Sequence, residues 1–152
     1  MPMDKDDVLH TLNDLIETCK DGEEGFRTCT EDIKRQDLKE IFSRAAQRCA
    51  ESARELQGHV QRLGGKPETK SSFAGSVHRR WVDIKSAIMG KDDAAVLAEC
   101  ERGEDVAKES YQKALKKDLP ADVRAVVERQ YQGVLEHHDM VRNLERTAKA
   151  SS

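Results

Sequence analysis

The sequence predicts an all-α protein, a bundle of four long helices that forms a single domain over residues 1–152. Charged residues make up 36% of the chain and aromatic residues only 4%, a composition typical of long amphipathic helices rather than of a β-sandwich. Apolar residues recur at steps of three and four in four separate stretches, which indicates one buried stripe on each helix. A chain of this length can bury a continuous core.

The first helix is expected over residues 4–35, where early aspartates suit a helix N-terminus. Its apolar phase runs unbroken from Leu12 to Ile33, although Gly22 and Gly25 lie in between. A glycine inside a helix costs about 1 kcal/mol, so a packing reason is expected. We therefore predict one continuous helix in which Gly22 lies against a neighbouring helix.

The second helix is expected over residues 38–63, directly after a connection of two residues. So short a link makes the first two helices antiparallel neighbours. Gly64 and Gly65, with Pro67 close behind, are a typical signal for the end of a helix.

Residues 65–92 form a connection that is too long for a simple turn. We expect it to carry a short helix at residues 77–89 and to cross the length of the bundle. Trp81, the only tryptophan, is expected to be buried there and to anchor this crossover to the bundle. The third helix then starts at the far end, as a bundle with one long crossover requires.

The third helix is expected over residues 93–117. Pro120 suits the first turn of a fourth helix, because proline is favoured at that position. This last helix is predicted to fray near residues 148–152.

The net charge of −3 provides no general basic field for nucleic acid or an anionic membrane. The crossover has a weak basic segment, but it contains acidic residues and a single tryptophan, so nucleic acid is not the expected partner. The basic residues concerned are Arg79, Arg80 and Lys85. No apolar run is long enough to span a bilayer, and Met1–Lys20 lacks a signal-peptide core. We expect a cytoplasmic protein, with a homo-oligomer and an unidentified protein partner left open.

The four cysteines lie in apolar stripes and show no Cys-x-x-Cys spacing, which argues against a structural zinc site. We expect them to be buried, reduced and slow to react, because burial disfavours the thiolate. A redox pair is the alternative, since several of them can meet in one core. The residues are Cys19, Cys29, Cys49 and Cys100.

The motif Leu63-Gly64-Gly65-Lys66-Pro67 resembles the end of the second helix in ferritin-like proteins. When the two are aligned on this motif, the metal-binding histidine of that family falls on Ser52 and its partner glutamate falls on Cys49. The resemblance therefore implies the fold without its usual di-iron ligands. The Glu-x-x-His motif, which places a carboxylate and an imidazole on one helix face, occurs nowhere in the chain.

Further motifs extend this likeness over nearly the whole chain. The chain resembles a bacterial family of four-helix-bundle proteins of unknown function with a ferritin-like fold, and this resemblance implies a fold but no activity. The matching stretches are residues 12–16, 21–26, 78–81, 101–105, 130–133 and 138–139.

Three ionisable residues fall on or beside the inner stripes, namely Glu23, Glu104 and His138. A buried ionised carboxylate is costly unless it is paired or protonated. We interpret these groups as a structural hydrogen-bond network that satisfies its own members or includes Ser52 or Tyr111. A site for a single divalent metal and simple surface exposure are the alternatives.

Other polar residues near the stripes are expected in water or at helix boundaries. These are Asp21, Glu24 and Glu101, and also the pair Glu55 and His59, whose spacing of four would allow chelation. No phosphate-binding glycine loop and no Ser/His/Asp or Cys/His arrangement is recognisable. The sequence thus favours a non-enzymatic bundle, stress-associated or partner-binding, with no cofactor. The alternative is a metal-binding or oxidoreductase-like protein with an unorthodox site on helices one, three and four.

Overall fold

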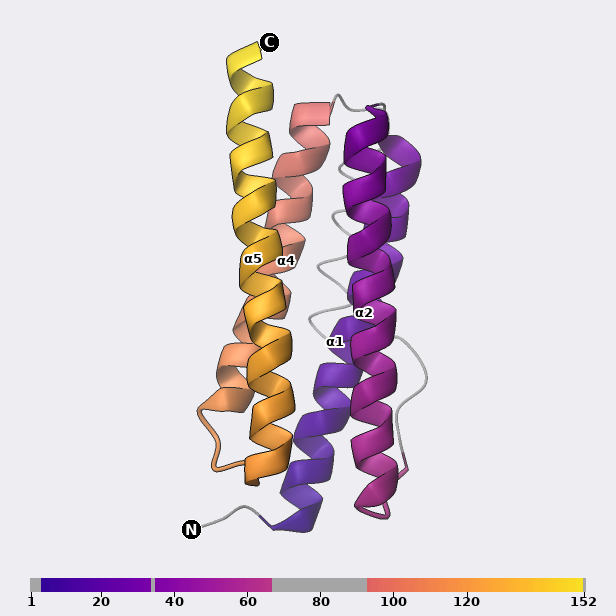
Figure 1. Ribbon diagram of the computed structural model, residues 1–152, viewed down its shortest axis with the longest axis vertical. Helices are drawn as coiled ribbons and strands as arrows, with labels where there is room; N and C mark the ends of the chain where they lie inside the picture. The colour runs from indigo at the N-terminus through magenta and orange to yellow at the C-terminus, as the bar shows by residue number, and fades with distance from the viewer. Residues whose placement is uncertain (1–3, 34, 67–92, 152) are drawn as a thin grey trace.

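The computed structural model describes residues 4–33, 35–66 and 93–151 and consists there of four helices packed along one axis (Figure 1). The predicted all-α bundle is confirmed, and the helix bounds differ from the predicted ones by a few residues. Helix α5 continues to Ser151, although the sequence predicts fraying from residue 148. The expected crossover helix, with Trp81 and the basic segment, lies outside the described residues. The helices are α1 (Lys5–Asp32), α2 (Gln36–Arg62), α4 (Asp93–Leu115) and α5 (Ala121–Ser151).

The order of the helices follows from where each begins and ends. Helix α2 returns antiparallel to α1, whereas α4 begins at the end of the bundle opposite to the end of α2 (Figure 1). The end of α2 and the start of α4 thus lie at opposite ends of the bundle, as the predicted long crossover requires. Helix α5 then runs antiparallel to α4.

Helix α1 is continuous through Gly22 and Gly25, as predicted. It begins with Asp4, whose side chain accepts a hydrogen bond of 2.9 Å from the Asp7 amide and so caps the helix. A Cβ placed on Gly22 would lie 3.1 Å from the Cys49 sulfur of α2. The glycine is therefore explained by the close approach of the second helix.

The two glycines after α2 have separate physical reasons. Gly64 has a φ of +80°, a conformation that glycine adopts without strain. The Gly65 amide donates to the Val60 carbonyl over 2.9 Å, which closes the last helical turn in a Schellman motif. A Cβ on Gly65 would lie only 2.5 Å from Leu9 Cδ2 of α1. The Gly-Gly pair thus ends α2 and lets α1 pass close by.

The bundle consists of two helix hairpins. Helix α1 packs along α2, and α4 packs along α5, while the hairpins meet mainly along α1 and α4. Helices α2 and α5 approach each other at few points. The bundle therefore has one closed seam between its hairpins and one open seam.

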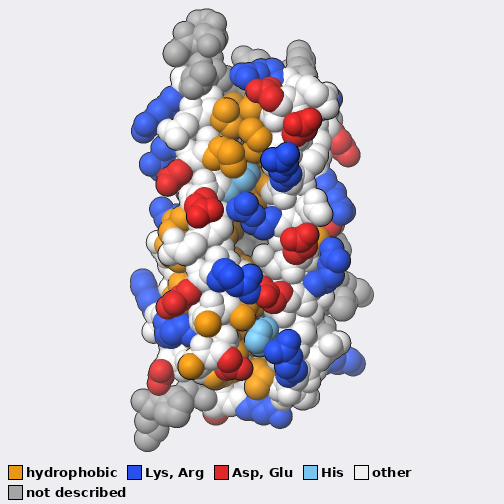
Figure 2. Space-filling model, in the orientation of Figure 1, with side chains coloured by type: hydrophobic (Ala, Val, Ile, Leu, Met, Phe, Trp, Pro, Cys, Tyr) orange, Lys and Arg blue, Asp and Glu red, His pale blue; other side chains and the backbone are white. Residues whose placement is uncertain are grey.

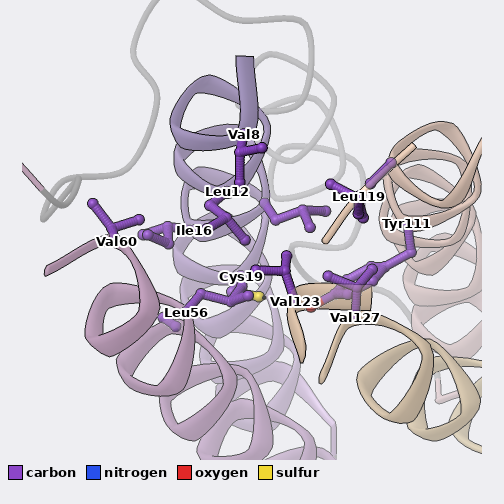
Figure 3. Close-up of a cluster of buried hydrophobic side chains, with 13 residues drawn as sticks. Val8, Leu12, Ile16, Cys19, Leu56, Val60, Tyr111, Leu119, Val123 and Val127 are labelled. Atoms are coloured by element: carbon purple, nitrogen blue, oxygen red, sulfur yellow. Dashed lines mark hydrogen bonds between the residues drawn. The ribbon is translucent and has the colours of Figure 1, made fainter. Parts of the chain in front are cut away.

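Two clusters of buried apolar side chains fill the core. The first, at one end of the bundle, includes Phe26, Cys29, Ile33, Leu38, Phe42, Val96, Leu97, Cys100 and Val141. The second, at the other end (Figure 3), includes Val8, Leu12, Leu15, Ile16, Cys19, Leu56, Val60, Tyr111, Val123 and Val127. Both draw on all four helices, so the stripes read from the sequence form the core. None of the helices in the described parts of the chain has the length and apolar character needed to cross a membrane.

Candidate functional site

Buried polar side chains gather around the middle of the bundle, where the two apolar clusters adjoin. They come from α1, α4 and α5 and are shielded from water despite their polarity. The set includes Asp21, Glu23, Glu104, Gln130, His137 and His138. Because buried polar groups are costly when unpaired, their partners decide what this region can do.

A chain of hydrogen bonds passes through all four helices at this level. The Tyr111 hydroxyl of α4 donates to Gln130 Oε1 of α5 over 2.8 Å. Since that hydrogen is used, the Cys19 thiol of α1, 3.2 Å away, is the donor to the tyrosine oxygen. Gln130 Nε2 then donates to Glu55 Oε1 of α2 over 2.8 Å. We call this series the Cys19–Glu55 chain.

The Cys19–Glu55 chain is neutral inside the bundle and charged at its outer end. Burial raises the pKa of Cys19 to about 11. Burial likewise raises the pKa of Tyr111 well above its usual value. Burial also acts to raise the pKa of Glu55, but hydrogen bonds from Gln130 and Arg129 outweigh it and lower the pKa. The buried members thus stay protonated, and the carboxylate beside Arg129 stays ionised.

A second buried pair joins α4 to α5. His137 Nδ1 lies 2.8 Å from Glu104 Oε1, and the two side chains are 8% and 4% exposed. The imidazole meets the rings of Phe26 and Phe42 edge-on, at centroid distances of 5.2 and 6.2 Å. Burial raises the pKa of Glu104, although the neighbouring His137 acts in the opposite direction. Among the described residues, Glu104 Oε2 and His137 Nε2 have no hydrogen-bond partner.

The three candidate residues of the sequence analysis go to three different pairs. Glu104 is paired with His137, as above. Glu23 lies 2.5 Å from Arg27 on its own helix. His138 Nε2 lies 2.7 Å from Asp105 Oδ1. Each is buried, as expected, but the single shared network that we predicted for them is wrong.

The two positions that align with the ferritin-like ligands carry other groups. Cys49 is a half-buried free thiol, and burial raises its pKa well above the usual value. Ser52 contributes its backbone carbonyl, which accepts a hydrogen bond of 3.4 Å from Gln130. Among the parts of the chain that are described, no three His, Cys, Asp or Glu side chains form a group that could hold a metal ion.

The open seam between α2 and α5 contains a polar cleft with a volume of about 430 Å³. Arg48 spans the seam and donates to the Gly133 carbonyl over 2.8 Å, and Arg129 pairs with Glu55 across it. Figure 2 shows one face of the bundle, on which basic and acidic side chains are interspersed with hydrophobic ones. The residues that line the cleft are Arg48, Glu51, Ser52, Glu55, Arg129, Gln130 and Gly133.

The prediction that all four cysteines are reduced is wrong for two of them. Cys29 of α1 and Cys100 of α4 form a disulfide. Both positions face the closed seam between the hairpins, where two apolar stripes meet. Cys19 and Cys49 are free, in agreement with the prediction.

Two further expectations about exposure are wrong. Asp21 is only 1% exposed, because α1 continues through it and leaves no helix boundary there. His59 is 9% exposed and belongs to the buried face of α2, so it does not form a water-exposed pair with Glu55. Glu24 is exposed as expected.

Sequence reasoning missed Gln130 and His137 as buried polar residues. A strict alternation of steps of four and three along α5 passes through both of them and bypasses His138. That series is Val123, Val127, Gln130, Val134, His137, Val141 and Leu144. The periodicity of α5 therefore does indicate that Gln130 and His137 are buried, provided that two polar residues are allowed on an apolar stripe.

Comparisons with known proteins support the fold. A family model described as "Domain of unknown function (DUF2383)" matches residues 7–117, from within α1 to just beyond α4. A solved two-domain protein from Anabaena variabilis ATCC 29413, which contains DJ-1/ThiJ/PfpI-like and ferritin-like domains, is similar over 97% of this chain, with a TM-score of 0.78 and 18% sequence identity. This chain spans 41% of the length of that protein. The comparison with curated proteins found no significant match. The likeness confirms the predicted ferritin-like fold.

Proposed function

Since this chain belongs to the family described as "Domain of unknown function (DUF2383)", whose description states no activity, we propose a function from its own side chains. The protein acts as a non-enzymatic, ferritin-like helical bundle that binds a partner and has no di-iron centre. Its buried polar groups serve to hold the four helices in register.

The Cys19–Glu55 chain is the observation that carries this proposal. It uses one or more polar groups from every helix at the level where a ferritin-like bundle would place metal ligands. A di-iron centre needs several carboxylates and histidines on facing helices. Here Cys49 and Ser52 occupy the two aligned ligand positions of α2, and a thiol and a hydroxyl do not replace a Glu–His pair.

The partner-binding part of the proposal is supported by the open seam. The polar cleft between α2 and α5 has a size in the range of small binding sites and offers two arginines and two glutamates. A homo-oligomer and an unidentified protein remain the proposed partners. Location in the cytoplasm likewise remains a proposal.

The experiment is anaerobic loading of the purified protein with ferrous iron, followed by exposure to oxygen. We expect no tight binding of two irons per chain and no rapid iron oxidation. A gain-of-function variant, Cys49→Glu with Ser52→His, restores the aligned pair and is the matched comparison. Two tightly bound irons and fast oxidation in the unmodified protein would overturn the proposal.

A second candidate function is the binding of one divalent metal ion. It is favoured by the buried Glu104–His137 pair, in which one oxygen and one ring nitrogen have no partner among the described residues. Glu23 and His138, the other candidates from the sequence, have partners of their own. Titration with zinc or manganese distinguishes the two functions, because binding that Glu104→Gln abolishes would favour the metal site.

A further inference from the structure

The Cys29–Cys100 disulfide joins the two hairpins at the seam where they pack most closely. Cys29 belongs to α1 and Cys100 to α4, and 71 positions of sequence separate them. Both side chains are completely buried in the first apolar cluster. The other two cysteines are free, so this bond is the only disulfide in the chain.

The opposite seam depends on weaker contacts. Helices α2 and α5 are connected there by Arg48 to the Gly133 carbonyl and by Arg129 and Gln130 to Glu55. The Arg129 and Glu55 side chains are 63% and 36% exposed, and ion pairs at such positions contribute little to stability. The α1–α4 seam therefore provides most of the association between the hairpins, and the disulfide lies in it.

We propose that Cys29–Cys100 is a redox-controlled crosslink that determines how readily the two helix hairpins separate. A small dithiol supplies two electrons and two protons, so that the sulfur–sulfur bond breaks into two thiols while the dithiol closes into a cyclic disulfide. Once the disulfide is reduced, α1 and α4 are joined only by non-covalent packing and by the polypeptide backbone between them. In a reducing compartment, disulfides are mostly transient or redox-sensing, which fits this role.

Cys19 provides a built-in reporter for separation. It lies on α1 in the second cluster and shares a hydrogen bond with Tyr111 of α4, across the same seam. Its sulfur is shielded while the hairpins are together, since the side chain is 5% exposed. Any separation of α1 from α4 exposes it to a thiol reagent.

The experiment uses the full chain after mild oxidation and compares it with the same protein reduced by dithiothreitol and then freed of reductant under anaerobic conditions. Counting thiols in denaturant should give two per chain before reduction and four after it, as the single disulfide implies. In native buffer, alkylation of Cys19, followed by mass spectrometry of its peptide, should become roughly tenfold faster or more after reduction, because a crosslink over a long loop restricts opening strongly. Circular dichroism should show that the helices persist.

A variant with both Cys29→Ser and Cys100→Ser is the matched control. It should show fast alkylation of Cys19 with or without prior dithiothreitol. If this variant does not fold, the comparison of oxidised and reduced wild-type protein still decides, because it changes no side chain. Four free thiols before reduction, an unchanged alkylation rate, or complete loss of helix on reduction would each overturn the proposal.

Discussion

Tyr111 takes part in two buried hydrogen bonds, one with the Cys19 thiol and one with the Gln130 side-chain oxygen. Its partners Cys19 and Gln130 are only 5% and 7% exposed, so neither can turn to water when the hydroxyl is removed. Single-residue changes at this position therefore measure what the Cys19–Glu55 chain contributes to the fold.

We predict that Tyr111→Phe lowers the free energy of unfolding by about 1–3 kcal/mol, because it leaves a buried acceptor and a buried thiol without a partner. Urea unfolding monitored by circular dichroism provides the measurement. Tyr131→Phe is the matched control, since its hydroxyl accepts a hydrogen bond from Gln112 at an exposed site, and should change stability by less than about 0.5 kcal/mol. Equal effects of the two substitutions would show that the Cys19–Glu55 chain contributes no more to stability than an exposed hydrogen bond does.

Glu104 makes the stability of the protein depend on pH. Its folded-state pKa lies above the unfolded value of 4.5, because burial penalises the carboxylate. The folded state therefore holds this proton more tightly, and the associated stability is present below the unfolded pKa and lost as pH rises through the folded pKa.

Glu104→Gln should remove this contribution while keeping the size of the side chain. The free energy of unfolding, measured from pH 4 to pH 8, should accordingly rise in the variant relative to wild type as pH increases. Glu24 is an exposed residue of α1, so the stability of Glu24→Gln, plotted against pH, should run parallel to that of wild type. If the stability of Glu104→Gln also ran parallel to that of wild type, the raised pKa of Glu104 in the folded state would be contradicted.

At the scale of the helices, α1 depends on Gly22 for its approach to α2. A side chain there meets the Cys49 sulfur, from which even a Cβ would be only 3.1 Å away. In contrast, a Cβ on Gly58 of α2 meets only the flexible end of Arg62, at 4.0 Å. The same substitution at these two glycines therefore separates packing from helix propensity.

We predict that Gly22→Leu costs roughly 1–3 kcal/mol of unfolding free energy through overpacking. Gly58→Leu should instead be neutral or stabilising, because leucine has the higher helix propensity. Both are measured by thermal and urea unfolding of the purified variants. An unchanged midpoint for Gly22→Leu would indicate that the two helices separate there at little cost.

The helices themselves could be predicted because each carries an apolar stripe and an end signal. The glycines at 64 and 65 are an example, since the φ of +80° and the passage of Leu9 are what such a pair commonly reflects. The site was harder to predict. Both His137 and His138 of α5 are buried, and apolar periodicity alone does not show which of two adjacent residues pairs with Glu104.

At the scale of the whole molecule, the features that escaped prediction are those that depend on the register between distant helices. Four cysteines on three apolar stripes are compatible with several pairings, and only the packing of α1 against α4 brings Cys29 to Cys100. The Cys19–Glu55 chain has the same origin, because its members come from all four helices. Sequence periodicity shows which face of each helix is buried, but it does not show how far each helix is shifted along the bundle axis relative to the others.

The ferritin-like fold therefore does not depend on the side chains that bind metal in other ferritin-like proteins. The ferritin-like arrangement of the helices is retained, with two antiparallel hairpins and with α4 starting at the end opposite to the end of α2. The buried side chains at its centre have partners within the protein: Glu104 pairs with His137, His138 with the exposed Asp105, and Tyr111 with Gln130. Such pairing stabilises a unique packing of the helices without a metal ion.

The central claim, that these polar groups bond to one another rather than to metal, is tested most directly by the metal content of the natively purified protein. Elemental analysis combined with native mass spectrometry should give iron, manganese and zinc far below one ion per chain. The mass of the folded protein should equal that of the polypeptide alone or a whole multiple of it. One or more divalent ions bound tightly to each chain, and lost in Glu104→Gln, would contradict the account.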